Sequence, residues 1–365
     1  AYLQLGLIAY NEDRYDDALR NYAYVTDNYK NTTSANEAMI AVKDIFIAKG
    51  DPEGYFAFIK KYPGANVSST TQDSVAYLAA ETQFSKGNFD GALKGFNNYL
   101  ISYPNGYFAL PAHFYRAECF YRNNEFDKAA LDYDFVTAQP ISRFTEKAVS
   151  RQAVVVYKQQ NYTKAYELFK KYKELASTDD AKREAILGLM RTSYKVKNYA
   201  DCIQNANEVL TLTGLSDYVI TEVKYFRGLS YFETTMYDKA KTDFNDVISK
   251  VQNEQAAESK FKIAKMQYLQ KQTKECEKTC FEFIDNYPSY EYWLINTYIL
   301  LSDNYLVTND LFQAKATLQS VLNNYEKDDD LRKMAQNKFN QIVALEAQNS
   351  KIKLDNNSTE MEFEK

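Results

Sequence analysis

The sequence predicts an all-α protein: a right-handed solenoid of about nine antiparallel helix pairs with a C-terminal capping helix. Three observations predict this fold. A short phrase returns at nearly constant spacing, apolar residues within each copy follow the helical period, and prolines occur only where helices are expected to end.

The repeated phrase is clearest in "NFDGALKGFNNYLISYP", and it returns as "EFDKAALDYDFVTAQP" and "NYTKAYELFKKYKELAS". Each copy has a small residue, called the anchor below, three positions after an aromatic residue. The anchors are Ala18, Ala92, Ala129, Ala165, Cys202, Ala240, Cys276 and Ala314, with Tyr55 in the degenerate copy "DPEGYFAFIKKYP". From Ala92 onward the steps are 37, 36, 37, 38, 36 and 38 residues, a period typical of helical repeat arrays.

Each repeat is expected to contain two helices. In the second helix, residues four and seven positions after the anchor share its face, as Phe96 and Tyr99 do after Ala92. The first helix carries a small residue, such as Gly228, where a bulkier one would block close helix approach. All prolines fall at expected helix ends, where proline is tolerated. They are Pro52, Pro63, Pro104, Pro111, Pro140 and Pro288.

The ends of the chain depart from the repeat. We expect the solenoid to cover residues 1–327, with its first repeat truncated at its start. Residues 328–348 have an acidic cap and one apolar stripe, which predict a capping helix. Residues 349–365 lack periodicity and are expected to form a disordered tail. The uncapped, apolar start is interpreted as a cut inside a longer protein, whose missing part could carry a signal peptide or membrane anchor.

Composition excludes some classes of protein. The net charge of −5 gives no overall electrostatic basis for binding nucleic acid. The sequence contains no apolar run long enough to predict a transmembrane helix. A hydrophobic content of 45% is enough for a continuous core, so the chain is not expected to be disordered as a whole.

No catalytic constellation is evident. The single histidine, His113, is expected to be packed and hydrogen-bonded, and Cys119 lies on a different face of the same helix. Cys276 and Cys280 lack the further ligands of a zinc site, so they and Cys202 are expected to be small buried residues. We therefore expect a protein that is not an enzyme and that needs no cofactor or metal.

The order of residues within each repeat resembles the tetratricopeptide repeat. Shared features are the small residue in the first helix, the aromatic residue opening the second, the anchor, a further aromatic residue and a closing proline. Three "YP" closures, at 62–63, 103–104 and 287–288, are similar to those of tetratricopeptide proteins of the bacterial envelope. The resemblance implies a scaffold that binds protein or peptide segments, located in the periplasm or at the outer membrane.

The resemblance also implies where partners bind. In this family the first helices line a concave groove. The residues carried over to that groove are Tyr77, Phe84, Phe114, Tyr121, Arg151, Tyr157, Lys158, Arg191, Tyr194, Lys195, Tyr225, Phe232, Phe261 and Tyr268. Tyrosine suits such a groove because it buries area while keeping a polar end in water. The alternative is that these rings only pack one repeat against the next.

Charge along the groove is uneven. A basic middle is followed and preceded by acidic residues, which would orient a partner with an acidic centre. The basic residues are Lys147, Arg151, Lys158, Arg191 and Lys195, and the acidic ones are Glu81, Glu118, Glu222, Glu233 and Glu258. Ordinary solvated helix charges are the alternative. Two other functions remain open: a carbohydrate- or peptidoglycan-binding module, and a regulatory module of a larger protein with an upstream domain.

Overall fold

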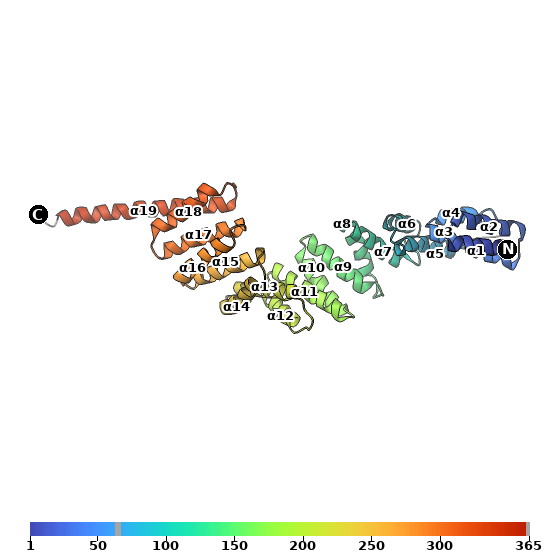
Figure 1. Cartoon of the computed structure of the whole chain (residues 1–365), viewed down its shortest axis with the longest axis horizontal. Helices are drawn as coiled ribbons and strands as arrows, with labels where there is room; N and C mark the ends of the chain where they lie inside the picture. The colour runs from blue at the N-terminus through green and yellow to red at the C-terminus, as the bar shows by residue number, and fades with distance from the viewer. Residues whose placement is uncertain (63–66, 363–365) are drawn as a thin grey trace. The chain divides into compact units, whose positions relative to one another are not determined.

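The computed structural model describes residues 1–62 and 67–362, with side chains described up to residue 348. Its helices run from α1 to α19, and the described residues contain no strand (Figure 1). This confirms the predicted all-α solenoid of nine helix pairs followed by a capping helix.

Each repeat consists of a first and a second helix. The first helices are α1 (Tyr2–Asn11), α3 (Thr33–Lys49), α5 (Ser69–Ser85), α7 (Ala109–Arg122), α9 (Thr145–Lys158), α11 (Asp179–Lys195), α13 (Asp217–Glu233), α15 (Glu254–Leu269) and α17 (Glu291–Val307). The second helices are α2 (Tyr15–Asn28), α4 (Pro52–Ile59), α6 (Phe89–Ser102), α8 (Phe126–Ala138), α10 (Tyr162–Leu175), α12 (Tyr199–Leu210), α14 (Tyr237–Lys250), α16 (Thr273–Asn286) and α18 (Leu311–Asn324). The capping helix is α19 (Asp330–Glu362).

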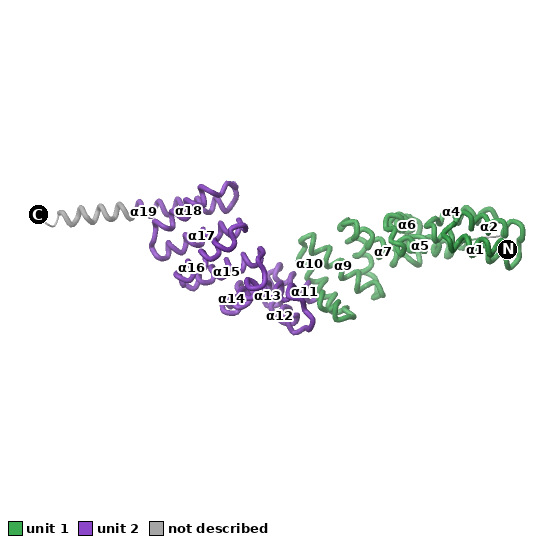
Figure 2. The backbone as a smooth tube through the Cα atoms, in the orientation of Figure 1, with its two compact units in different colours: residues 1–185 green, residues 186–365 purple. Residues whose placement is uncertain are grey.

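The chain divides into two compact units, unit 1 over residues 1–185 and unit 2 over residues 186–365 (Figure 2). The boundary falls inside α11. A single solenoid domain over 1–327 therefore stays a prediction. Helix α19 runs past residue 348, where we expected the cap to end. The expected disordered tail, 349–365, falls on residues whose side chains lie outside the description, and it also stays a prediction.

Within each unit, successive helices pack in the order of the chain. In unit 1, α6 packs against its own first helix α5 and against the next first helix α7. In unit 2, α14 packs in the same way against α13 and α15. Each second helix thus fills the space between two first helices, as expected of a repeat array in which neighbours supply one another's core.

The anchors lie at the centre of this packing. Eight of the nine have no exposed surface, and Tyr55 is 6% exposed, which confirms the predicted register. Opposite the anchors, space is tight: a Cβ at Gly6 would lie 2.7 Å from the Tyr22 ring, and one at Gly228 would lie 2.9 Å from the Phe244 ring. Both rings stand four residues after an anchor. Burying such a ring stabilises the fold by roughly 1.5–3 kcal/mol, and the small first-helix residue makes the burial possible.

The turn between the two helices of every repeat has one residue in the left-handed conformation, five positions before the anchor. These residues are Asp13, Gly50, Gly87, Asn124, Gln160, Lys197, Thr235, Lys271 and Asn309, with φ between 55° and 78°. Only two of them are glycine. The other seven hold a side chain in a region that L-residues disfavour, so the packing of the two helices imposes this turn on them.

The repeat with the degenerate phrase departs most from the pattern. Its second helix α4 has 8 residues, whereas the other second helices have 12 to 14. The side chain of Asp51 caps α4 by accepting a hydrogen bond from the Gly54 amide at 2.9 Å. Tyr55 and Ile59 still join the core of unit 1, but α4 contacts α5 less extensively than the other second helices contact their next first helix.

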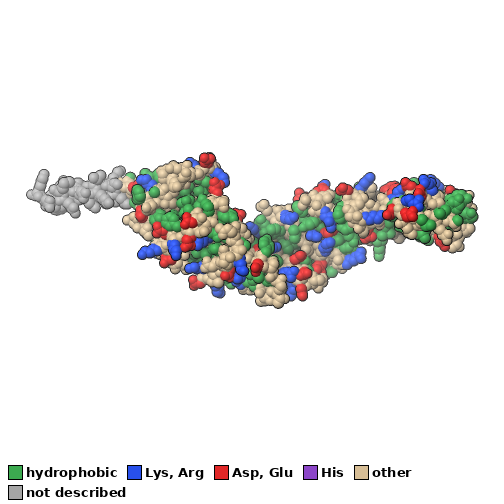
Figure 3. Space-filling view, viewed as in Figure 1, with side chains coloured by type: hydrophobic (Ala, Val, Ile, Leu, Met, Phe, Trp, Pro, Cys, Tyr) green, Lys and Arg blue, Asp and Glu red, His purple; other side chains and the backbone are tan. Residues whose placement is uncertain are grey.

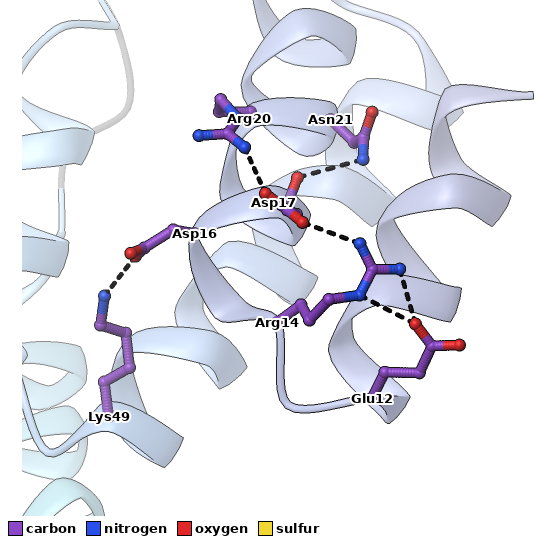
Figure 4. A network of polar contacts seen from close by, with 7 residues as sticks. All are labelled: Glu12, Arg14, Asp16, Asp17, Arg20, Asn21 and Lys49. Carbon is purple, nitrogen blue, oxygen red and sulfur yellow. Dashed lines mark hydrogen bonds and ion pairs between the residues drawn. The ribbon is translucent and has the colours of Figure 1, made fainter.

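Charged residues link the first turn of unit 1 to its second repeat (Figure 4). Arg14 donates to Glu12 at 2.6 Å and to Asp17 at 2.7 Å. The Lys49 ammonium, at the end of α3, lies 2.7 Å from a carboxylate oxygen of Asp16 at the start of α2. Because these pairs are exposed, they contribute little to stability, and the buried rings dominate it.

We expect Ala129→Arg to destabilise unit 1 by about 4 kcal/mol or more. Ala129 has no exposed surface and lies in a cluster with Phe114, Ala117 and Tyr133, where a guanidinium has no room and would be buried. Urea unfolding followed by circular dichroism measures the effect. Ala138→Arg, at the exposed end of the same helix, is the control, and equal stability of the two variants would contradict the anchor assignment.

Thr235→Gly should raise stability by about 1 kcal/mol, because Thr235 is β-branched and has φ of 60°. Gly87→Ala should lower stability by a similar amount. A Cβ at Gly87 would meet no atom within 4 Å, so only its φ of 78° opposes the substitution. Urea midpoints of the two variants check this, and shifts of the same sign would show that the turn is not strained.

Candidate functional site

The first helices form one layer of each unit. In unit 1, α1 contacts α3, α3 contacts α5 and α5 contacts α7; in unit 2, α13 contacts α15 and α15 contacts α17. Among the described residues, second helices of successive repeats do not contact one another to a similar extent. The layer of first helices is therefore the inner side of each unit, and it carries the expected groove residues.

Two of the expected groove residues lie in the core. Tyr77 is 2% exposed, stacks on Phe108 with ring centroids 4.5 Å apart and donates a hydrogen bond to Glu81 at 2.8 Å. Phe114 is 4% exposed and lies 4.9 Å from Phe144. Burial, reinforced by Glu81, raises the pKa of the Tyr77 hydroxyl. Both rings pack one repeat against the next.

The aromatic residues near the ends of α5, α7, α9, α11, α13 and α15 are only half-buried. Five of them contact the aromatic residue that opens the following second helix, five positions on. The pairs are Phe84–Phe89, Tyr121–Phe126, Tyr157–Tyr162, Tyr194–Tyr199 and Phe232–Tyr237, with centroids 5.3 to 5.9 Å apart. Tyr268 is half-buried in the same helical position, but Thr273 opens its second helix. The sequence predicted the first ring of each pair as a groove residue but did not predict this contact.

In unit 1 the expected acidic flank and basic middle contact each other. Glu118 is 4% exposed and accepts a hydrogen bond from the Tyr133 hydroxyl at 2.7 Å. A carboxylate oxygen of Glu118 lies 3.1 Å from the Lys147 ammonium, and another lies 3.4 Å from Arg151 Nε. One buried carboxylate thus joins α7 and α8 to α9.

Unit 2 pairs its charges more completely. Arg191 donates two hydrogen bonds of 2.7 Å to Glu222, and Lys262 lies 3.6 Å from Glu233. The Tyr225 hydroxyl donates to Glu258 at 2.5 Å. Burial raises the pKa of Glu258, and the Tyr225 hydrogen bond opposes that rise.

Two further expected residues of unit 2, Phe261 and Lys195, differ in their burial. Phe261 is half-buried and lies 5.4 Å from Trp293, the only tryptophan of the chain. Lys195 is exposed. Because Arg151 and Lys158 belong to unit 1, whereas Arg191 and Lys195 belong to unit 2, a continuous basic middle of the groove stays a prediction.

A row of cations in unit 1 begins just before α9 and continues along that helix. We call Arg143, Lys147, Arg151 and Lys158 the α9 cation row. Each cation lies over an aromatic ring: Arg143 over Phe144 at 4.7 Å, Lys147 over Phe114 at 5.8 Å, Arg151 over Tyr121 at 4.6 Å and Lys158 over Phe126 at 4.4 Å. Such contacts are attractive because the ring face is negative. Arg143, which lies two residues before α9 begins, was not among the residues predicted for the basic middle.

The row is accessible to solvent. The Lys147 side chain is 55% exposed and that of Arg151 is 37% exposed, whereas the Glu118 side chain beneath them is 5% exposed. Figure 3 shows basic side chains among hydrophobic ones on unit 1. The arrangement can pair carboxylates of a bound molecule while the rings remain covered by the cations.

The single histidine is packed, as predicted. His113 Nδ1 lies 2.6 Å from an Asp132 carboxylate oxygen, and its ring stacks on Phe135 with centroids 3.8 Å apart. Arg116 donates two hydrogen bonds of 2.7 Å to the same Asp132. The histidine therefore belongs to a contact between two helices of one repeat.

The cysteines are buried, as predicted for Cys202, Cys276 and Cys280. All four are free thiols without exposed surface. Burial raises the pKa of the Cys119 thiol to about 12 and that of Cys202 to about 11. Within the described residues, no group of histidine, cysteine or carboxylate side chains is arranged to hold a metal ion. None of the described helices is long and apolar enough to cross a bilayer.

Stacked helix pairs with an inner layer of first helices define a helical-repeat protein. The family model of the tetratricopeptide repeat matches residues 77–139. This match confirms the resemblance to the tetratricopeptide repeat that was expected from the order of residues in each repeat. That fold supports a protein-interaction scaffold, and proteins of this kind are generally non-catalytic.

Among the solved structures to which this chain is similar, one reaches a TM-score of 0.50. The C-terminal part of a repeat-containing protein from Cytophaga hutchinsonii is 16% identical, with a TM-score of 0.50 over 71% of this chain and 98% of that one. A tetratricopeptide protein from Parabacteroides merdae is 11% identical, with a TM-score of 0.44 over 73% and 98%. A signal-transduction ATPase with a tetratricopeptide sensor from Pyrococcus horikoshii is 14% identical, with a TM-score of 0.49 over 87% and 51%. No curated protein matches the sequence significantly.

We expect none of the four cysteines to react with a thiol reagent such as DTNB at pH 8 in the folded protein. Each thiol is buried, and the raised pKa values of Cys119 and Cys202 keep these two protonated at that pH. All four should react after unfolding in guanidinium chloride. A thiol that reacts rapidly in the folded protein would contradict the assignment of these residues to the core.

Proposed function

We propose that this chain is a non-catalytic scaffold and that the inner side of unit 1 binds an acidic segment of a partner protein. The α9 cation row carries the proposal. Three cations lie along α9 and the fourth, Arg143, lies just before its start, and Glu118 is the carboxylate that pairs with two of them. The row therefore keeps an excess of positive charge on a chain whose net charge is −5.

The cations and the rings have different roles in this proposal. Exposed ion pairs contribute about 0.2–1 kcal/mol each, so the row mainly steers and orients an acidic segment. Half-buried rings such as Phe84, Tyr121 and Tyr157 offer apolar contact beside the row. Of these rings, Phe84 and Tyr157 supply the larger share of affinity, because Arg151 covers the face of Tyr121 and burying apolar area is the dominant favourable term.

The residues of unit 2 form a second part of the proposal. Seven of the expected groove residues lie on first helices of that unit: Arg191, Tyr194, Lys195, Tyr225, Phe232, Phe261 and Tyr268. The ion pair of Arg191 with Glu222 leaves less uncompensated charge here than in unit 1. We propose that this surface contacts a less acidic part of the same partner.

The contacts favour a protein partner over a sugar. Sugars stack on open ring faces, but Arg151 covers the Tyr121 face and Lys158 covers the Phe126 face. A carboxylate can reach these cations from solvent without displacing them. The "YP" closures, similar to those of envelope tetratricopeptide proteins, are the reason for including a bacterial envelope assembly in the proposal.

A peptide of alternating glutamate and leucine, labelled with fluorescein, tests the proposal by fluorescence anisotropy. We expect it to bind at 50 mM salt, and the matched lysine–leucine peptide to bind at least tenfold more weakly. Lys147→Glu with Lys158→Glu should weaken binding of the acidic peptide at least fivefold, because two attractive charges become repulsive. The difference should shrink at 0.5 M salt, where surface charges are screened.

The control reverses two charges elsewhere. Lys170→Glu with Lys171→Glu makes the same change in net charge on α10, where both lysines are exposed. This variant should bind like the parent. Equal loss in the two double variants would mean that overall charge, and not the α9 cation row, governs binding.

A further inference from the structure

Unit 1 contains a cavity of about 460 Å³ on the side of the second helices, away from the proposed groove residues. It lies between α4 and α6, above α5. Its floor is formed by Ala76, Ala79 and Ala80 of α5, and its α6 wall includes Lys94, Asn98 and Ser102. This repeat leaves open a space that side chains would fill in a fully packed array.

Two other repeats show what occupies this place. Thirteen residues before its anchor, the repeat of Ala129 has Arg116, which binds Asp132 of its own second helix through two hydrogen bonds of 2.7 Å. Arg116 also donates to Asn97 of the preceding second helix at 3.1 Å. A first-helix side chain thus reaches into the slot between two second helices and joins them.

The repeat of Ala240 repeats this arrangement in unit 2. Arg227 binds Asp243 through hydrogen bonds of 2.8 and 2.7 Å and donates to Asn207 of the preceding second helix at 2.7 Å. The same three sequence positions make the same contacts in both repeats. The slot is therefore a regular feature of the fold.

In the repeat of Ala92, the position of the arginine is Ala79 and the position of the aspartate is Gly95. Sixteen residues before the anchor, Ala76 takes the place of His113. Every other repeat has a larger side chain at the position of Ala79. These side chains are Leu5, Val42, Arg116, Gln152, Leu189, Arg227, Ile263 and Leu301. The cavity is the slot that the other repeats fill with their own side chains.

The short helix α4 opens the slot further. It lines the cavity with Pro52, Glu53 and Phe56 near its start, and it ends at Ile59. In the other repeats a second helix of 12 to 14 residues stands at the corresponding place. One wall of the cavity is thus shorter than in a regular repeat, which gives access from solvent.

We propose that this cavity receives a bulky apolar side chain, of leucine to tryptophan size, inserted by a segment of a partner protein. The floor offers alanine methyl groups, and Gly95 stands where Asp132 and Asp243 hold the arginines of the other two repeats. Ile263 and Leu301, at the position of Ala79, show that aliphatic side chains suit this place in the fold. The volume is within the range of about 300–1,000 Å³ typical of ligand pockets.

Polar side chains on the α6 wall can form hydrogen bonds with the main chain of the inserted segment. Lys94, Asn98 and Ser102 are four residues apart, so they lie on one face of α6. Within the described part of the chain these three side chains make no hydrogen bond or ion pair. Donors and acceptors on this wall can bond to the backbone that flanks the inserted side chain, since a segment entering the cavity gives up hydrogen bonds to water.

Small amides that mimic one residue of a peptide test the proposal. The full chain is labelled at alanine methyl groups and titrated with N-acetyl-L-leucinamide, N-acetyl-L-tryptophanamide and, as control, N-acetyl-L-alaninamide. We expect saturable NMR shifts of the Ala76, Ala79 and Ala80 methyl signals with the two bulky amides. The alanine amide should bind at least tenfold more weakly because it leaves the cavity largely unfilled.

Two substitutions fill the cavity from within. Ala79→Leu introduces the side chain found at the equivalent Leu301, and Ala76→Val introduces that of Val149, so each has a precedent in the same fold. Either should weaken binding of the leucine amide at least tenfold, while Ala138→Leu, at an exposed site of α8, should leave it unchanged. Using both filled variants keeps the test valid if one of them fails to fold.

The outcomes are distinct. Loss of the shifts in a filled, folded variant, with binding retained in Ala138→Leu, supports the proposal. Absence of saturable shifts with both bulky amides overturns it, as does unchanged affinity in the filled variants. Binding of the acidic peptide at the α9 cation row should be unaffected by Ala79→Leu, so the two sites are tested separately.

Discussion

The fold depends on a close approach between the two helices of each repeat. The anchor has no bulk to hold the helices apart, and the first helix is small where a ring of the second helix meets it, as at Gly6 against Tyr22. The rest of the repeat follows from this contact. A ring four residues after the anchor is buried, and the turn adopts a left-handed residue even where that residue is Lys197 or Thr235. The strain at this one residue is tolerated because the helix packing that the turn permits stabilises the repeat by more than the strain destabilises it.

Neighbouring repeats are joined by polar contacts laid over this apolar frame. Glu118 connects α7 to α9, and Arg116 and Arg227 each connect two second helices. Removing one partner of such a buried pair costs more than the pair itself contributes, since the remaining charge stays desolvated. These contacts therefore help to fix which repeats are neighbours. They also pair charged side chains that could otherwise bind a partner. The α9 cation row differs because its cations remain accessible to solvent.

The sequence predicted the helix pairs and the buried anchors because both follow from periodicity within one chain segment. It also predicted correctly that His113 would be packed and hydrogen-bonded. It left open whether Tyr77 and Phe114 line a groove or pack one repeat against the next, and it did not predict that Glu118 would contact Arg151. These outcomes depend on which side chains of adjacent repeats meet, and that is set by the packing of one helix pair on the next. The cavity was missed for the same reason: Ala79 and Gly95 are ordinary small residues until they are compared with Arg116 and Asp132 of the next repeat.

The single tryptophan has an optical consequence. Trp293 lies in unit 2 and contacts Phe261, while the described part of unit 1 contains tyrosine and phenylalanine as its only aromatic fluorophores. Fluorescence excited at the red edge of the indole absorption band therefore reports the environment of Trp293, and so the folding of unit 2 alone. Tyrosine emission and circular dichroism report the whole chain. Comparing the two signals during unfolding distinguishes a chain that melts as one cooperative body from one whose halves melt in separate steps.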